Sequence, residues 1–398
     1  MTTATLRPFR WFILLALLLL PRAAQSQAPA AWTAFAKTFM QYADSDRIVG
    51  ATVVLMKNGA VIARQHVGLQ DRARNLATGD SSIYHWGSIT KTLTAVAIMQ
   101  LRDRGKLSLD DKLTRYLPEL RRVHDPFGMM DSITIRMLLS HSAGFRSGTW
   151  PYGDGNSWQP FEPTEWSQLV AMMPYQQLLF KPGSRYGYSN PGFVYLARIV
   201  ESLTGDPWDA YVAKNIFAPL GLSRSYFRAT PYYLASHRSH NYDVRRDSAS
   251  GQPRIVENAT EFDPGITTPN GGWNAPVADL ARWAAFLGNT VPPGGSREFY
   301  ETVLKRSSLE EMWRPVVPMS AGYEATSNQS MGLSFFVQSR DNARIIGHTG
   351  SQAGFRSFMY LNPANGMAVI AVFNTTNYAS PAAALYDRMH KAAKELLW

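Results

Sequence analysis

Two short apolar stretches near the N-terminus predict a β-hairpin. Residues 51–57 and 60–67 are rich in β-branched and other apolar side chains, and only the dipeptide Asn58-Gly59 separates them. An Asn-Gly pair readily adopts the positive φ angles that a two-residue hairpin turn requires. We therefore expect two antiparallel strands joined by a tight turn.

The C-terminal part of the chain continues this pattern. Residues 343–347, 356–362 and 367–374 are three apolar runs that alternate with turn residues, and the stretch 381–397 is typical of a helix. Two strands at one end of the chain and three at the other predict a single sheet assembled from both ends, with the helical middle beside it. The expected fold class is α/β, of the α+β type, with an antiparallel sheet of five or more strands flanked by helices and a mainly helical lobe.

The middle of the chain carries the strongest helical patterns. The stretch 88–104 is apolar on nearly every face, which predicts a buried helix, and Gly105 is a natural C-terminal stop. Helices are also expected at 191–205 and at 276–288. The aromatic loop 144–166 has two open interpretations, because it either lines a pocket for apolar groups or packs as a surface loop.

The first 28 residues have the pattern of a secretory signal. Arg7 and Arg10 precede the uninterrupted apolar run 11–20, and residues 24–26 offer small side chains for cleavage. Ten apolar residues are too few to cross a bilayer core of about 30 Å, so we expect removal of residues 1–26 rather than a retained N-terminal anchor. The expected location is periplasmic or secreted, with no stable membrane span after signal removal.

Composition and charge exclude several function classes. The 398 residues include no cysteine, which rules out disulfides, thiolate nucleophiles, iron–sulfur clusters and cysteine-based zinc sites. The formal charge of +10 falls to +7 without the three arginines of the signal, and no run of five or six basic residues suggests a nucleic-acid partner. The eight histidines show no metal-binding spacing, so we expect neither a metal nor another cofactor.

The tetrapeptide Ser88-Ile89-Thr90-Lys91 opens the predicted buried helix. Residues three apart lie on one face of a helix, so the serine hydroxyl and the lysine amine can meet. A serine hydroxyl needs a base to become a nucleophile, and burial near a helix N-terminus lowers the pKa of a lysine enough for it to serve as that base. Taken alone, the same spacing also fits an ordinary helix cap.

Two further segments carry candidate chemistry. Tyr188, in a predicted turn, can ionise near a cationic site and act as a base or an acid, while Asn190 can hydrogen-bond a lysine or a substrate amide. The segment His348-Thr349-Gly350-Ser351 ends a predicted strand, where glycine allows close approach of a substrate backbone and the strand edge offers peptide groups for pairing. In isolation, each segment is also typical of an ordinary turn or strand end.

Together and in this order, the three segments resemble the motif set of the serine β-lactamases and penicillin-binding proteins. The chain is similar to the class C β-lactamase-like serine hydrolases, which include class C β-lactamases, D-Ala-D-Ala carboxypeptidases, D-aminopeptidases and family VIII carboxylesterases. The resemblance covers nearly all of the chain after the signal. It rests on the segments 85–92, 138–144, 187–192, 271–273 with 279–281, and 348–350.

The resemblance implies a single β-lactamase-related catalytic domain over residues 27–398, with the fold of the serine β-lactamases and penicillin-binding proteins. Its α/β lobe would comprise about 27–87 and 290–398, and its helical lobe about 88–289. The implied partners are small-molecule esters, amides or cell-wall peptides as substrates.

The resemblance also implies an acyl-enzyme route. Ser88 would attack a carbonyl carbon while Lys91 and Tyr188 relay its proton. The oxyanion would lie between the backbone N–H groups of Ser88 and Ser351. Asn190 would position the lysine or the substrate amide.

One position departs from the β-lactamase pattern. β-Lactamases usually have lysine where this chain has His348, and a histidine with an ordinary pKa is largely neutral at pH 7. The implied substrate-binding residues are Asn190, His348, Thr349, Gly350 and Ser351. Because of His348, we expect a weaker demand for a substrate carboxylate, which favours esters or D-amino-acid peptides. A true β-lactamase and a non-turnover penicillin- or cell-wall-peptide-binding protein are the alternatives.

His141, which follows a buried Leu-Leu pair, is interpreted as structural.

Overall fold

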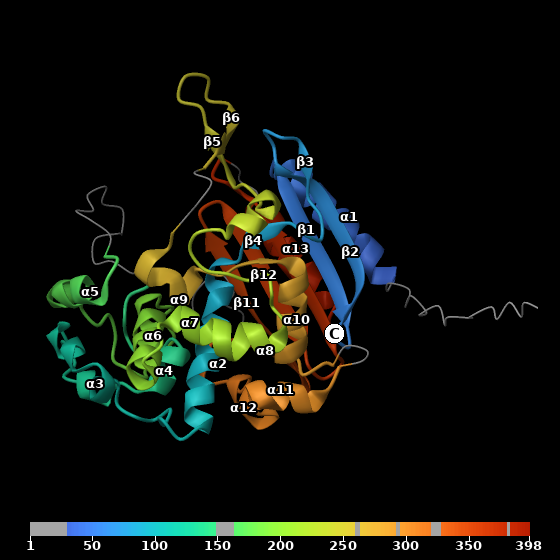
Figure 1. The fold of residues 1–398 in the computed structure, drawn as a ribbon. Helices are drawn as coiled ribbons and strands as arrows, with labels where there is room; N and C mark the ends of the chain where they lie inside the picture. Colours follow the sequence, from blue (N-terminus) through green and yellow to red (C-terminus); the bar gives the residue numbers. More distant parts are fainter. Residues whose placement is uncertain (1–29, 149–162, 259–262, 292–294, 320–327, 380–382) are drawn as a thin grey trace, which may run out of the picture.

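The computed structural model describes residues 30–148, 163–258, 263–291, 295–319, 328–379 and 383–398 (Figure 1). The predicted signal and most of the aromatic loop 144–166 lie outside the described residues, so both stay predictions. No helix within the described ranges is both long and apolar enough to cross a membrane.

A nine-stranded antiparallel sheet organises the chain. Its strands, in spatial order, are β3 (Leu76–Ala77), β2 (Ala60–Asp71), β1 (Gly50–Lys57), β13 (Met367–Phe373), β12 (Phe355–Asn362), β11 (Ala343–Gln352), β10 (Phe336–Arg340), β9 (Gln329–Met331) and β8 (Val317–Pro318). β1 pairs with β13, for example through Val54 and Ile370. This pairing confirms the predicted sheet assembled from both chain ends, and with it the fold class.

The hairpin of β1 and β2 has the geometry that its sequence predicts. Asn58 and Gly59 adopt φ angles of 48° and 79°, which are the paired positive values of a two-residue turn. The strands pair from Lys57 and Ala60 next to the turn up to Gly50 and Gly68.

β11 is longer than the sequence pattern indicates. The prediction that its strand stops at residue 347 is wrong, because pairing with β12 continues from His348 opposite Met359 to Gln352 opposite Phe355. Glycine weakens the β signal in a sequence. In the fold the same glycines permit close contacts that a side chain would block, so the segment 348–351 lies within a strand.

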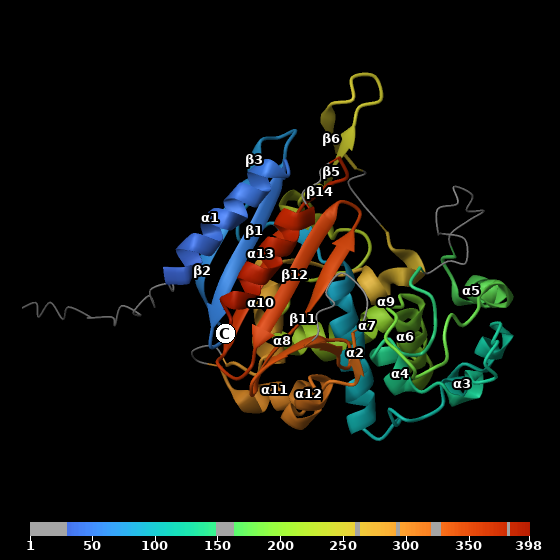
Figure 2. The same cartoon turned by 180° about the vertical axis from the view of Figure 1, so that it is seen from behind.

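Helices cover both faces of the sheet (Figures 1 and 2). α1 (Ala30–Ser45) and α13 (Ala383–Glu395) pack against each other on one face, and α10 (Val277–Leu287) packs on the other against β1, β2 and β13. Successive strand residues point to opposite faces, and Val53 and Val54 accordingly belong to two different apolar clusters. The sheet is therefore buried on both sides.

The helical part of the molecule is arranged around α2 (Thr90–Asp103), which contacts α6 (Pro191–Thr204) and α9 (Thr268–Gly271). Every residue of α2 from Thr90 to Leu101 is buried, which confirms the predicted buried helix. α6 ends at Gly205 with a φ of 77°, and α6 and α10 confirm the other two predicted helices.

The remaining elements are shorter. The short helices are α3 (Leu113–Tyr116), α4 (Ile135–Leu139), α5 (Trp166–Met172), α7 (Trp208–Val212), α8 (Ala218–Leu220), α11 (Arg297–Val303) and α12 (Arg306–Met312). Two small sheets, which the sequence pattern did not predict, order β14 (Thr375–Asn377), β5 (Tyr242–Arg246) and β6 (Pro253–Glu257), and pair β4 (Ile83–His85) with β7 (Asn274–Pro276). They connect the middle of the chain to its two ends.

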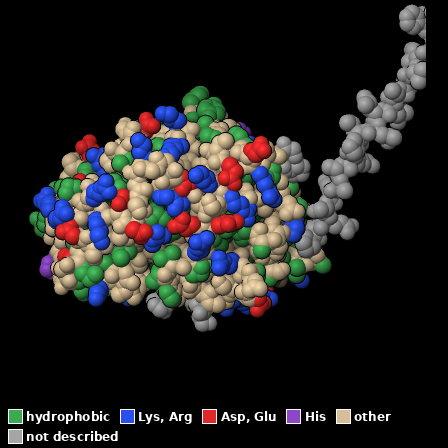
Figure 3. Space-filling model, turned by 90° about the horizontal axis from the view of Figure 1, so that it is seen from below, with side chains coloured by type: hydrophobic (Ala, Val, Ile, Leu, Met, Phe, Trp, Pro, Cys, Tyr) green, Lys and Arg blue, Asp and Glu red, His purple; other side chains and the backbone are tan. Residues whose placement is uncertain are grey.

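Basic and acidic side chains are intermingled on the face shown in Figure 3. Ion pairs of this kind join separate elements: Arg102 at the end of α2 lies 2.7 Å from Glu311 of α12, and Arg136 of α4 lies 2.8 Å from Asp110. Such partly exposed pairs each contribute little stability, so the packing of the apolar clusters contributes more to the stability of the fold than these pairs do.

One buried amide connects three distant parts of the chain. Asn374 follows β13 and has no exposed surface. Its Oδ1 accepts from the Gly50 N–H at 2.7 Å, and its Nδ2 donates to the Leu69 carbonyl at 2.9 Å and to Ser239 Oγ at 3.0 Å. Asn374 therefore connects strands from the two ends of the chain to a loop from its middle.

Replacing Asn374 by alanine is expected to lower the free energy of unfolding by roughly 2–4 kcal/mol, because it leaves buried backbone groups without a partner. Urea denaturation measures the change. Gln252→Ala, on the exposed β5–β6 turn, is the control and should change stability by less than about 0.5 kcal/mol. Equal effects of the two substitutions would contradict the role assigned to Asn374.

Candidate active site

The turn that carries Ser88 packs closely against β11. A single 3₁₀ turn, Gly87–Ile89, leads into α2. Gly87 has a φ of 54°, and a Cβ on it would lie 2.8 Å from the Ser351 nitrogen, while a Cβ on Gly350 would lie 2.0 Å from the Trp86 carbonyl oxygen. Both positions therefore require glycine. This contact brings the peptide groups around Ser88 and Ser351 together.

Lys91 is the base nearest to Ser88. Its Nζ lies 3.0 Å from Ser88 Oγ and donates to the carbonyl of Asn270 at 2.8 Å. The lysine has no exposed surface, and burial lowers the pKa of its amine well below the ordinary value of 10.5. A charged ammonium is costly in such a place, so burial favours the neutral amine, which is the form that can accept a proton.

Tyr188 completes the group. Its hydroxyl is hydrogen-bonded to Ser88, and burial raises the pKa of the phenol well above 10. Lys91 Nζ lies 5.0 Å from the centre of the tyrosine ring. The expectation that Tyr188 ionises easily is wrong, because burial raises its pKa by more than the hydrogen bond with Ser88 lowers it. The protonated phenol is therefore favoured over the phenolate.

The structure differs from the sequence prediction in the hydrogen-bond partner of Lys91. The second hydrogen-bond partner of Lys91 is the backbone carbonyl of Asn270, in α9, and not the side chain of Asn190. The carbonyl of Asn190 lies 3.5 Å from Asn270 Nδ2. Sequence reasoning missed Asn270 as a partner of the lysine, because a backbone carbonyl carries no residue-type signal.

The segment 348–351 of β11 faces the serine turn along one edge. β10 pairs with β11 only as far as Gly347, so the edge of residues 348–352 that faces away from β12 has no strand partner within the described residues. Thr349 is half-buried and Ser351 is exposed. This edge can receive an extended substrate backbone through strand-like pairing.

His348 lies inside the protein rather than on its surface. Its ring stacks on Phe336 with centres 4.8 Å apart, and its centre is 6.2 Å from that of Tyr188. His348 Nδ1 lies 2.6 Å from the Thr349 carbonyl oxygen. The imidazole is held by aromatic neighbours where the β-lactamase pattern has a lysine.

An apolar cluster borders this side of the site. Tyr188 packs against it, and the cluster consists of Tyr186, Val317, Met319, Met331 and Phe336. Its residues come from β8 and the residue that follows it, from β9 and β10, and from the turn before Tyr188. The wall next to Tyr188 therefore favours uncharged groups.

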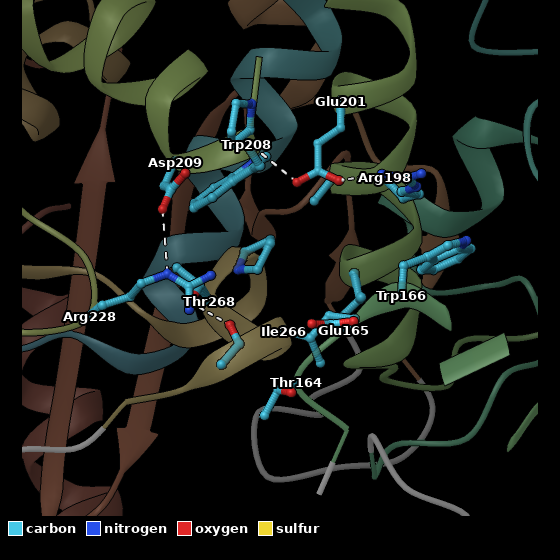
Figure 4. Close-up of a pocket in the computed structure, with 15 residues that line it drawn as sticks. Thr164, Glu165, Trp166, Arg198, Glu201, Trp208, Asp209, Arg228, Ile266 and Thr268 are labelled. Carbon is cyan, nitrogen blue, oxygen red and sulfur yellow. Dashed lines mark hydrogen bonds and ion pairs between the residues drawn. The ribbon is translucent and has the colours of Figure 1, made fainter. Parts of the chain in front are cut away.

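A separate cavity of about 260 Å³ lies on the other side of α9 (Figure 4). Its charged lining is largely paired: Arg198 lies 3.1 Å from Glu201, and Arg228 lies 3.5 Å from Asp209. Pro269 lines the cavity, while the next residue, Asn270, contacts Lys91. Because neither Ser88 nor Lys91 lines it, this cavity is distinct from the serine site.

Comparison with known proteins places this constellation in a class. The family model described as Beta-lactamase matches residues 35–394. Protein flp of Staphylococcus aureus (strain COL) is 23% identical over 334 residues, which cover 84% of this chain and 61% of flp. The chain thus spans about three fifths of that relative. Esterase EstB of Burkholderia gladioli is 33% identical over 189 residues, which cover 44% of this chain and 46% of EstB.

Solved structures show the same fold. The octameric penicillin-binding protein homologue from Pyrococcus abyssi has a TM-score of 0.73 at 25% identity, over 92% of this chain and 77% of that one. The D-stereospecific amidohydrolase from Streptomyces sp. has a TM-score of 0.67 at 25% identity, over 90% and 98%. A class C β-lactamase has a TM-score of 0.70 at 18% identity, over 92% and 95%.

The chain places a serine and a buried lysine one turn apart beside a strand of an antiparallel sheet, in a fold that it shares with a penicillin-binding protein homologue and a class C β-lactamase. The chain belongs to the Beta-lactamase family.

Replacing Lys91 by methionine is expected to raise the melting temperature at pH 7 by roughly 2 °C or more. In the wild-type protein the unfolded state binds one more proton than the folded state at every pH between the lowered pKa of Lys91 and its unfolded pKa of about 10.4. Wild-type stability therefore rises with pH in that range, and the advantage of the variant shrinks toward pH 10. Thermal melts at pH 7 and pH 10 measure it.

Lys214→Met is the matched control, because the side chain of Lys214 is 71% exposed. It should show no comparable gain at pH 7. A stability difference between Lys91→Met and wild type that stays constant from pH 7 to pH 10 would contradict a neutral Lys91.

Proposed function

We propose that this protein is an exported serine hydrolase that forms an acyl-enzyme on Ser88 and hydrolyses an ester or an amide. One observation carries the proposal: Ser88 Oγ lies 3.0 Å from the amine of the fully buried Lys91. A neutral lysine in hydrogen-bond contact with a serine is an activated nucleophile pair. The signal pattern of residues 1–26 supports export, and N-terminal sequencing of the exported protein checks their removal.

The proposed reaction has two halves, acylation of Ser88 and hydrolysis of the acyl-enzyme, and Lys91 and Tyr188 transfer protons in both. Ser88 Oγ attacks the carbonyl carbon and its proton passes to the Lys91 amine, while the oxyanion is held by the backbone N–H groups of Ser88 and Ser351. Tyr188 then donates its proton to the departing alcohol or amine and regains one from Lys91. Water attacks the acyl-enzyme by the reverse proton path, which releases the carboxylic acid and free Ser88.

Two features of the site favour an uncharged acyl group or a D-amino-acid derivative as substrate. His348 stands where β-lactamases have a lysine that would attract a substrate carboxylate, and an apolar cluster borders Tyr188. The names of two similar proteins agree with this class, since one is an esterase and another is a D-stereospecific amidohydrolase. We therefore place carboxylesterase and D-amino-acid peptidase-like activities ahead of β-lactam hydrolysis.

Ser88→Ala is expected to reduce hydrolysis of p-nitrophenyl butyrate by on the order of 10³-fold or more, because the nucleophile is lost. Steady-state rates measure the effect, with a D-Ala-D-Ala peptide and nitrocefin as further substrates. Ser202→Ala, on α6 away from the site, is the control. Full activity in Ser88→Ala would refute the assignment. Preferential turnover of nitrocefin would indicate a β-lactamase, and an acyl group that persists for hours would indicate a binding protein.

His348→Lys is expected to raise kcat/KM for nitrocefin relative to p-nitrophenyl butyrate by about tenfold, because a cation then faces the substrate carboxylate. Gln352→Lys, which adds the same charge on the same strand, is the control for a general electrostatic effect. An unchanged ratio in His348→Lys, in a variant whose melting temperature shows that it is folded, would show that His348 does not set this preference.

A further inference from the structure

His141 adopts an unusual backbone conformation directly under Tyr188. It follows α4 with a φ of 53°, a left-handed value that a side chain other than Gly, Asn or Asp seldom adopts. The residue is 1% exposed. Its ring stacks on the Tyr188 ring, with centres 4.3 Å apart and planes 27° apart.

Two hydrogen bonds tie the residues on either side of Tyr188 to His141. The Gly187 N–H donates to the His141 carbonyl at 2.8 Å. The Ser189 N–H donates to His141 Nδ1 at 3.0 Å. The turn that carries the tyrosine is thus held at both flanks and against the ring face by a single residue.

The hydrogen bond from Ser189 also fixes the protonation state of the imidazole. Since Nδ1 accepts, the ring proton lies on Nε2 and the imidazole is neutral. Burial lowers the pKa of His141 well below 6.5. The ring therefore keeps the same form, and the same hydrogen bond, across neutral pH.

We infer that His141 is a positioning residue for the proposed reaction: by stacking on Tyr188 and anchoring Gly187 and Ser189, it holds the phenol hydroxyl against Ser88. This inference rests on the proposed function, because it assigns His141 a task only through the tyrosine relay. It goes beyond the structural role that the sequence indicates, since a structural residue would support the fold without setting the position of the hydroxyl.

His141→Asn is the informative variant. Asparagine tolerates the left-handed conformation, and its Oδ1 offers an acceptor near the position of Nδ1. The variant therefore preserves the turn and removes the ring stack. We expect kcat for p-nitrophenyl butyrate to fall roughly 10- to 100-fold, the size of effect seen when a catalytic group is misplaced by about 1 Å. KM should stay within about threefold.

A double-mutant cycle with Tyr188→Phe separates positioning from simple support of the fold. Phenylalanine keeps the ring but lacks the hydroxyl, so His141→Asn should cost less than about threefold in that background. The rate of Ser88 labelling by a fluorophosphonate gives the same comparison without dependence on the ester. An equal fold-loss in both backgrounds would overturn the inference.

A matched control uses another buried histidine. His390 is 4% exposed and packs on Tyr386 and Tyr360, far from the serine on the other face of the sheet. His390→Asn should lower the melting temperature and leave kcat within about twofold. If it lowers kcat as much as His141→Asn does, the inference fails. If wild-type Ser88 neither reacts with the fluorophosphonate nor hydrolyses the ester, the proposed function itself fails.

Discussion

The burial of Lys91 is the constraint on which the site depends. Burial disfavours the charged form of an amine with no exposed surface and lowers its pKa well below the ordinary value. Burial acts on Tyr188 as well: it raises the pKa of the phenol despite the hydrogen bond with Ser88, and it therefore favours the protonated hydroxyl.

That burial is possible because segments far apart in the chain meet around α2. α6 and α9 pack on it, and the turn before it is pressed against β11 at contacts that only Gly87 and Gly350 permit. The sheet that contains β11 is held together by pairing of β1 with β13, which come from the two ends of the chain. Asn374 connects this sheet to the middle of the chain through a hydrogen bond to Ser239. The positions of Ser88, Lys91 and Tyr188 therefore depend on the whole fold.

Two buried histidines, His348 and His141, lie next to the candidate active site. His348, stacked on Phe336, stands where the β-lactamase pattern has a lysine. His141 has a left-handed backbone conformation, and its ring stacks on Tyr188. Both imidazoles are buried against aromatic neighbours.

The sequence by itself determined the hairpin at Asn58-Gly59, the buried helix after Ser88 and the sheet from both chain ends, because turn chemistry and hydrophobic period are local properties. It also indicated Ser88 and Lys91 as a candidate pair of nucleophile and base, since residues three apart share one face of a helix. Only the tertiary structure decided the rest. The continuation of β11, the carbonyl of Asn270 on the lysine and the protonated state of Tyr188 depend on long-range contacts and on burial, which no local pattern records.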